Sequence, residues 1–74
     1  MLSSRWHVSA RIFVDAKSEI WEFILAHPEG STLNQIMLGT GYSRPMAIAC
    51  TEELYIEGRI SIENDDRFKP ENDQ

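Results

Sequence analysis

The sequence predicts a small α+β domain in which three helices precede a two-stranded hairpin, with an N-terminal extension that is either a strand or a helix. The chain of 74 residues is long enough for one domain, and 42% hydrophobic with 26% charged residues is ordinary globular composition. Apolar residues recur at helical spacing in the middle of the chain and alternate with polar ones near its C-terminal end. We therefore expect an N-terminal extension over 1–15, a folded domain over 16–69 and a disordered acidic tail over 70–74.

The N-terminal extension has the pattern of a strand with one buried face. Apolar residues alternate with polar ones from Trp6 to Val14, although Phe13 interrupts the polar side. A helix is the alternative, because Val8, Arg11 and Ile12 also fit a 3.6-residue repeat weakly. The sequence favours a strand here and leaves a helix open.

The first helix of the folded domain has the clearest periodicity. Asp15 or Ser18 can cap its N-terminus, and the segment 28–30, Pro-Glu-Gly, ends it, because proline and glycine both interrupt helical geometry. His27, beside this segment, is expected to be a residue of the helix end and not a metal ligand. The stripe that faces the core contains Ile20, Phe23, Ile24 and His27, widened by Trp21 and Leu25.

Two shorter helices follow. Ser31 or Thr32 caps a second helix that the segment 39–41, Gly-Thr-Gly, ends after barely two turns. Ser43 caps a third, with Pro45 in its first turn, where a missing N–H costs nothing. This third helix should run from residue 44 to about 57 and end at Gly58. Beyond it, Ile60, Ile62 and Phe68 alternate with polar residues around a turn at 64–66, which predicts two short strands.

The order of these elements and several local motifs resemble the winged helix-turn-helix superfamily of prokaryotic and viral regulators. The first helix ends in Ala26-His27-Pro28-Glu29-Gly30, the second begins with Thr32-Leu33-Asn34-Gln35-Ile36, and the third opens with Gly41-Tyr42-Ser43-Arg44. The third closes with Leu54-Tyr55-Ile56-Glu57-Gly58-Arg59-Ile60, so the resemblance covers about residues 18–69. It implies three helices followed by a two-stranded wing, with the third helix entering the major groove of DNA by its N-terminal end.

Carried onto this chain, the resemblance gives a set of candidate DNA contacts. Arg44 is the best candidate for a base edge, since its planar fork matches the two acceptors of guanine. Arg67 and Lys69 on the hairpin are candidates for phosphate or minor-groove contacts, and Thr32 and Asn34 for neutral phosphate bonds. The remaining candidates lie on or next to the third helix: Tyr42, Ser43, Met46, and Ile48 or Ala49.

The charge pattern limits this prediction. The net charge of −5 comes from residues 49–74, which hold three basic and eight acidic side chains, whereas residues 1–48 hold four of each. The third helix carries Glu52 and Glu53, and the hairpin turn carries Asp65 and Asp66. Weak binding by a monomer is therefore expected, with useful affinity in a homodimer. The candidate dimerisation residues are Trp6, Val8, Ile12 and Val14 of the extension.

Other classes of function find little support. We predict no enzyme, since no nucleophile, base and oxyanion arrangement and no phosphate-binding glycine loop can be assembled. Two histidines and one cysteine without close spacing predict no metal site, no cofactor is implied, and Cys50 is expected to be a buried thiol. The apolar run 20–26 is too short to cross a bilayer. A single cysteine cannot form an internal bridge and nothing points to an oxidising compartment, so a cytoplasmic protein is expected. The alternative function is a winged-helix module that binds a protein partner and not DNA.

Overall fold

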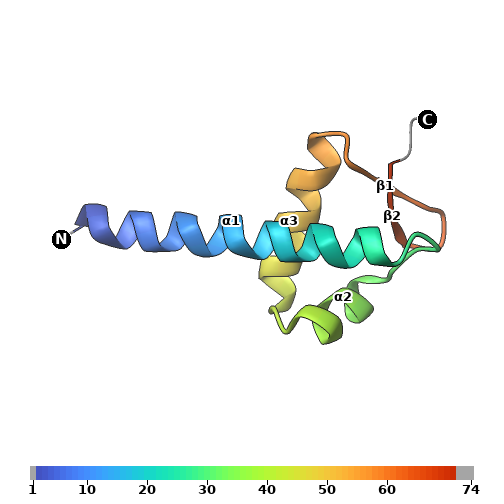
Figure 1. The fold of residues 1–74 in the computed structure, drawn as a ribbon, viewed down its shortest axis with the longest axis horizontal. Coiled ribbons are helices and arrows are strands. Elements are labelled where there is room, and N and C mark those ends of the chain that lie inside the picture. Colours follow the sequence, from blue (N-terminus) through green and yellow to red (C-terminus); the bar gives the residue numbers. More distant parts are fainter. Residues whose placement is uncertain (1, 72–74) are drawn as a thin grey trace.

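The computed structural model describes residues 2–71, with side chains described from residue 12 onward. Within this range the chain forms a small α+β domain of three helices and one antiparallel hairpin (Figure 1). The long helix α1 crosses α3, and α2 and the hairpin pack at the C-terminal end of α1. The elements are α1 (Leu2–Ala26), α2 (Leu33–Thr40), α3 (Arg44–Ile56), β1 (Ile60–Ile62) and β2 (Phe68–Pro70).

The N-terminal extension is helical, so the predicted strand over residues 6–14 is wrong and the helical alternative is right. Helix α1 continues without a break from Leu2 to Ala26, because no glycine or proline interrupts it. The predicted caps Asp15 and Ser18 are also wrong, since both are exposed residues of the helix interior. No helix in the described part of the chain is long and apolar enough to cross a membrane.

The connection between α1 and α2 pairs with β2 of the hairpin through an isolated antiparallel bridge. Gly30 adopts a φ of 114°, which L side chains rarely tolerate, and Ser31 is then buried and pairs with Phe68 of β2. The Ser31 N–H donates to the Phe68 carbonyl at 3.0 Å, and the Phe68 N–H donates back at 2.7 Å. These bonds fix the start of α2 against the hairpin.

Both short helices begin at the predicted caps. The Thr32 hydroxyl accepts from the Gln35 N–H at 3.2 Å, while the Gln35 amide oxygen accepts from the Thr32 N–H at 2.9 Å, a complete capping box. Ser43 caps α3 by accepting from the Met46 N–H at 3.4 Å. Gly41 takes the left-handed conformation that ends α2.

The core lies where α3 crosses α1 and α2. Ala47 is fully buried at this crossing, as expected for a small residue between closely packed helices. The Thr51 hydroxyl is also buried and donates to the carbonyls of Ala47 and Ile48. Cys50 is a buried thiol, as predicted, and burial raises its pKa above 9.0. The buried apolar residues are Ala16, Ile20, Ile24, Ile36, Ala47, Cys50, Leu54 and Ile60.

The C-terminal end of α3 is attached to α1 by a charged cluster. Lys17 of α1 pairs with Glu57, which also forms a salt bridge with Arg59 at 3.2 Å, and the Arg59 guanidinium lies over the Trp21 ring at 5.6 Å from its centroid. A carboxylate at the C-terminal end of a helix is unfavourable beside the carbonyl dipoles, so the two cations offset this cost. The hydrogen bond from Lys17 is the main reason that the pKa of Glu57 is lowered.

The hairpin has two chemically different faces. Its register pairs Ile60 with Pro70, Ser61 with Lys69 and Ile62 with Phe68. Residues paired directly opposite each other lie on the same face of an antiparallel ladder, so Ile60, Ile62 and Phe68 share one face and Lys69 lies on the other. The predicted disorder from Pro70 onward is wrong for the first two residues: Pro70 belongs to β2, and the N–H of residue 71 donates to the Arg59 carbonyl at 2.7 Å. The rest of the predicted tail, 72–74, lies outside the described residues.

Candidate nucleic-acid interface

The N-terminal ends of α2 and α3 meet beside the hairpin turn and form the edge at which duplex contact was predicted. Thr32, Asn34 and Arg44 line one hollow there, together with Asp66 of the turn. Asn34 and Arg44 are both exposed, and Ser43 is exposed at the cap that precedes Arg44. Four of the predicted contacts thus gather at this edge, which we call the leading edge (Thr32, Asn34, Ser43 and Arg44).

The two hairpin cations do not join the leading edge. Arg67 and Lys69 lie two residues apart in and beside β2, on the face opposite Phe68, whereas Phe68 lines the hollow that contains Arg44. Arg67 and Lys69 instead line a second hollow. The Arg67 guanidinium there lies 2.9 Å from the Asp65 carboxylate and donates to the Gly30 carbonyl at 3.5 Å. The hairpin therefore separates the predicted phosphate contacts from the predicted base reader.

Two further predicted contacts, Tyr42 and Met46, are half-buried and pack against the core. Desolvation, together with Glu19 and Asp15 of α1, raises the pKa of Tyr42 above 10.0. The Tyr42 side chain packs against the core that α1 and α3 share. It does not belong to the leading edge.

Acidic groups weaken the positive potential around each of these cations. Asp66 shares the hollow of Arg44, and Asp65 is paired with Arg67. The hollow that contains Lys69 also holds Glu29 and Glu63. A cation whose nearest neighbour is a carboxylate contributes little to long-range attraction of a polyanion. The electrostatic signal for DNA is therefore local and small.

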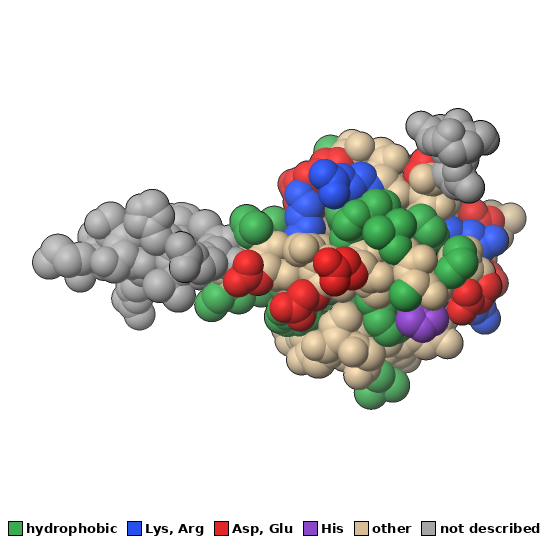
Figure 2. Space-filling model, viewed as in Figure 1, with side chains coloured by type: hydrophobic (Ala, Val, Ile, Leu, Met, Phe, Trp, Pro, Cys, Tyr) green, Lys and Arg blue, Asp and Glu red, His purple; other side chains and the backbone are tan. Residues whose placement is uncertain are grey.

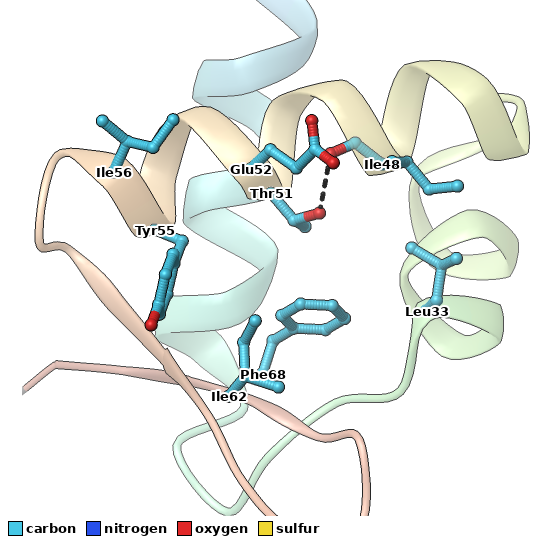
Figure 3. A pocket seen from close by; sticks show the side chains of 8 residues that line it. All are labelled: Leu33, Ile48, Thr51, Glu52, Tyr55, Ile56, Ile62 and Phe68. Carbon is cyan, nitrogen blue, oxygen red and sulfur yellow. Dashed lines mark hydrogen bonds between the residues drawn. The ribbon is translucent and has the colours of Figure 1, made fainter.

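An apolar groove lies on the outer face of α3. Ile48 and Tyr55 lie seven residues apart on this helix, and the side chains that complete the groove come from other elements: Leu33 from α2, and Ile62 and Phe68 from the hairpin. Figure 3 shows these side chains converging on the space between α3 and the hairpin. The groove, of about 410 Å³, is lined by Leu33, Ile48, Thr51, Glu52, Tyr55, Ile56, Ile62 and Phe68.

The predicted dimerisation segment projects from the domain. The N-terminal half of α1 extends beyond the other elements (Figure 1), and the molecule measures 44 × 26 × 19 Å along its principal axes. Figure 2 shows hydrophobic side chains at the surface of the described part of the molecule. Ile12 and Val14 are 49% and 60% exposed, as expected for unpartnered apolar residues at the base of this projection. Trp6 and Val8 lie outside the residues whose side chains are described.

Comparison with known proteins gives no match: no protein family, no curated protein and no solved structure matches this chain.

Proposed function

We propose that this protein is a small transcriptional regulator of the winged helix-turn-helix type that binds double-stranded DNA through the leading edge. The observation that carries the proposal is the convergence of Arg44, Thr32 and Asn34 at the exposed N-terminal ends of two helices. Free backbone N–H groups and the helix dipoles favour phosphate at such ends, and an exposed Arg in the first turn can reach a base edge. The arrangement of three helices and a hairpin supports this assignment.

The proposed contact is small, so the affinity of one copy is low. Arg44 is the cation of the leading edge, and Arg67 and Lys69 lie across the hairpin. Even if all three touched phosphates, the slope of log K against log salt would be no steeper than about −3, at about −0.9 for each neutralised phosphate. A homodimer that brings two leading edges to one duplex would double this number.

The experiment that tests the proposal changes one charge at the leading edge without disturbing the backbone. Asp66 has a φ of 63°, a conformation that asparagine tolerates as well as aspartate does. Asp66→Asn removes the carboxylate beside Arg44, so we expect duplex binding to tighten about threefold to tenfold at low salt, equivalent to ~0.7–1.4 kcal/mol. Fluorescence anisotropy with a labelled mixed-sequence duplex measures the change.

Matched variants distinguish a local effect from a general charge effect. Asp15→Asn makes the same charge change at an exposed position of α1 and should leave binding nearly unchanged. Arg44→Ala should weaken binding, while Arg59→Ala, at the other end of α3, serves as its control. If Asp66→Asn and Asp15→Asn behaved alike, and Arg44→Ala and Arg59→Ala did too, the leading edge would not be the duplex contact.

A second candidate function is a module that binds protein through the apolar groove. The groove itself favours it, because Ile48, Tyr55, Ile56 and Ile62 remain exposed around a single carboxylate, Glu52. Exposed apolar surface of this kind is typical of protein interaction sites. Indifference to duplex at low salt, together with binding that groove variants abolish, would favour this second function.

A further inference from the structure

The apolar groove needs an occupant that DNA does not supply. A duplex presents phosphates to a protein surface, which neither cover isoleucine side chains nor tolerate Glu52 at close range. Duplex contact at the leading edge therefore leaves the groove open. Near the C-terminal end of α3, Ile56 is 75% exposed and Tyr55 is 54% exposed.

The N-terminal part of α1 has the charge and length to fill the groove. Residues 1–14 contain Arg5 and Arg11 and no acidic residue, and the charged residue in the lining of the groove is the acidic Glu52. The stretch that precedes Phe13, where packing of α1 on the core begins in the described part of the chain, is about 16 Å long at 1.5 Å per residue. The face of α3 from Ile48 to Ile56 is about 12 Å long by the same measure.

This segment cannot reach the groove of its own chain. Helix α1 runs unbroken into the core, and α3 packs against it through Ala47, Cys50 and Leu54. The groove lies on another face of α3, lined by Ile48, Glu52 and the residues that follow. Only a second copy can present its N-terminal segment there.

We propose that the N-terminal segment of α1, residues 2–12, lies in the apolar groove of a second copy, and that the exchange is reciprocal. The inference rests on the docking function proposed above for the groove. In a symmetric exchange, each copy fills the groove of the other through the same contact. No groove is then left for a third copy, so the assembly stops at a dimer. Direct pairing of two N-terminal segments is less favourable, because it would bring Arg5 and Arg11 of both chains together without an acidic partner.

The test measures self-association of the full chain by sedimentation equilibrium across a concentration series. Ile56→Asp places a charge in the groove at a position exposed enough to leave folding intact, and should weaken the dimer at least about tenfold. Leu38→Asp is the matched control, since Leu38 is 86% exposed on α2 and lies outside the groove. It should leave the dimer unchanged, and far-UV circular dichroism confirms that both variants fold.

A charge exchange identifies the occupant. Glu52→Lys should weaken the dimer, Arg5→Glu with Arg11→Glu should weaken it too, and the three changes combined should restore part of the lost affinity. Monomeric wild-type protein at every concentration would overturn the inference in favour of a foreign partner. A dimer that Ile56→Asp and Glu52→Lys leave intact would overturn it as well. Duplex binding is judged separately by Asp66→Asn and Arg44→Ala, so either proposal can fail alone.

Discussion

The contact between Gly39 of α2 and Phe23 of α1 has a measurable consequence for stability. A Cβ atom placed on Gly39 would clash with Cε2 of the Phe23 ring and lie 2.8 Å from Cζ. The Phe23 ring also stacks on His27 with centroids 4.2 Å apart, so moving the ring away from a new Cβ atom would disturb this stacking. The His27 Nδ1 atom is in turn 2.8 Å from the Phe23 carbonyl oxygen. Gly39 is therefore required by packing and not by its backbone conformation.

Gly39→Ala should destabilise the domain in spite of better helix propensity. Overpacking of this kind costs about 1–3 kcal/mol, whereas alanine in a helix interior gains about 1 kcal/mol over glycine. The net loss should thus be up to about 2 kcal/mol, or several degrees in Tm for a domain of this size. Removing the ring should reverse the sign: in a Phe23→Ala background, Gly39→Ala should stabilise by about 1 kcal/mol, since only the propensity gain remains.

Urea unfolding of the four proteins of this double-mutant cycle measures the coupling. If Phe23→Ala does not fold, Phe23→Leu replaces it, since leucine lacks the two atoms closest to the new Cβ. Gly41→Ala is the control, because Gly41 has a φ of 83° with nothing within 4 Å of its Cβ position. It should lose about 1–2 kcal/mol from backbone strain alone, whatever residue occupies position 23. A Gly39→Ala effect of equal sign in both backgrounds would refute the packing explanation.

Two further predictions concern ionisable groups. Glu57 has a lowered pKa in the folded state, so its stabilising contribution is present above the unfolded-state value near 4.5 and is lost as pH falls through the folded value. The stability difference between wild type and Glu57→Gln should therefore shrink in urea titrations below about pH 4.5, and a difference that stays constant there would contradict the lowered pKa of Glu57. Cys50 is buried with a raised pKa, so thiol labelling at pH 8 should be slow in the folded protein and fast in denaturant. Rapid labelling of the folded protein would contradict the burial of Cys50.

Local chemistry explains which elements the sequence predicted well. Thr32 and Ser43 cap their helices through side-chain oxygens only three residues away, and Gly41 and Gly58 adopt the left-handed turns that glycine permits. Whether the start of α1 forms a strand or a helix depended on the availability of a sheet edge, which local chemistry does not determine. An alternating pattern suits a strand only where a sheet offers it an edge, and the bridge between Ser31 and Phe68 occupies an edge of this small sheet. Extension of an existing helix needs no new nucleus, so α1 continues toward Leu2.

The residues of the leading edge could each be named from the sequence. The way in which residues from different elements come together in space could not be predicted. Exposure of Arg44 follows from its position in the first turn of α3, after Ser43. The groove draws its lining from three elements, so no periodicity within α3 could indicate that Leu33 and Phe68 complete it. The opposite placement of Arg67 and Phe68 does follow from strand alternation, once Phe68 is known to pair with Ile62.

This alternation decides how the hairpin cations can act on DNA. A duplex that meets Arg44 approaches the hairpin on the face of Ile62 and Phe68, away from Lys69. Lys69→Ala should then weaken binding no more than Arg59→Ala, which removes the same charge at the far end of α3. If Lys69→Ala instead matched Arg44→Ala, and the double variant lost the sum of both effects, the duplex would contact both faces of the hairpin. Contact by the leading edge alone would then be wrong.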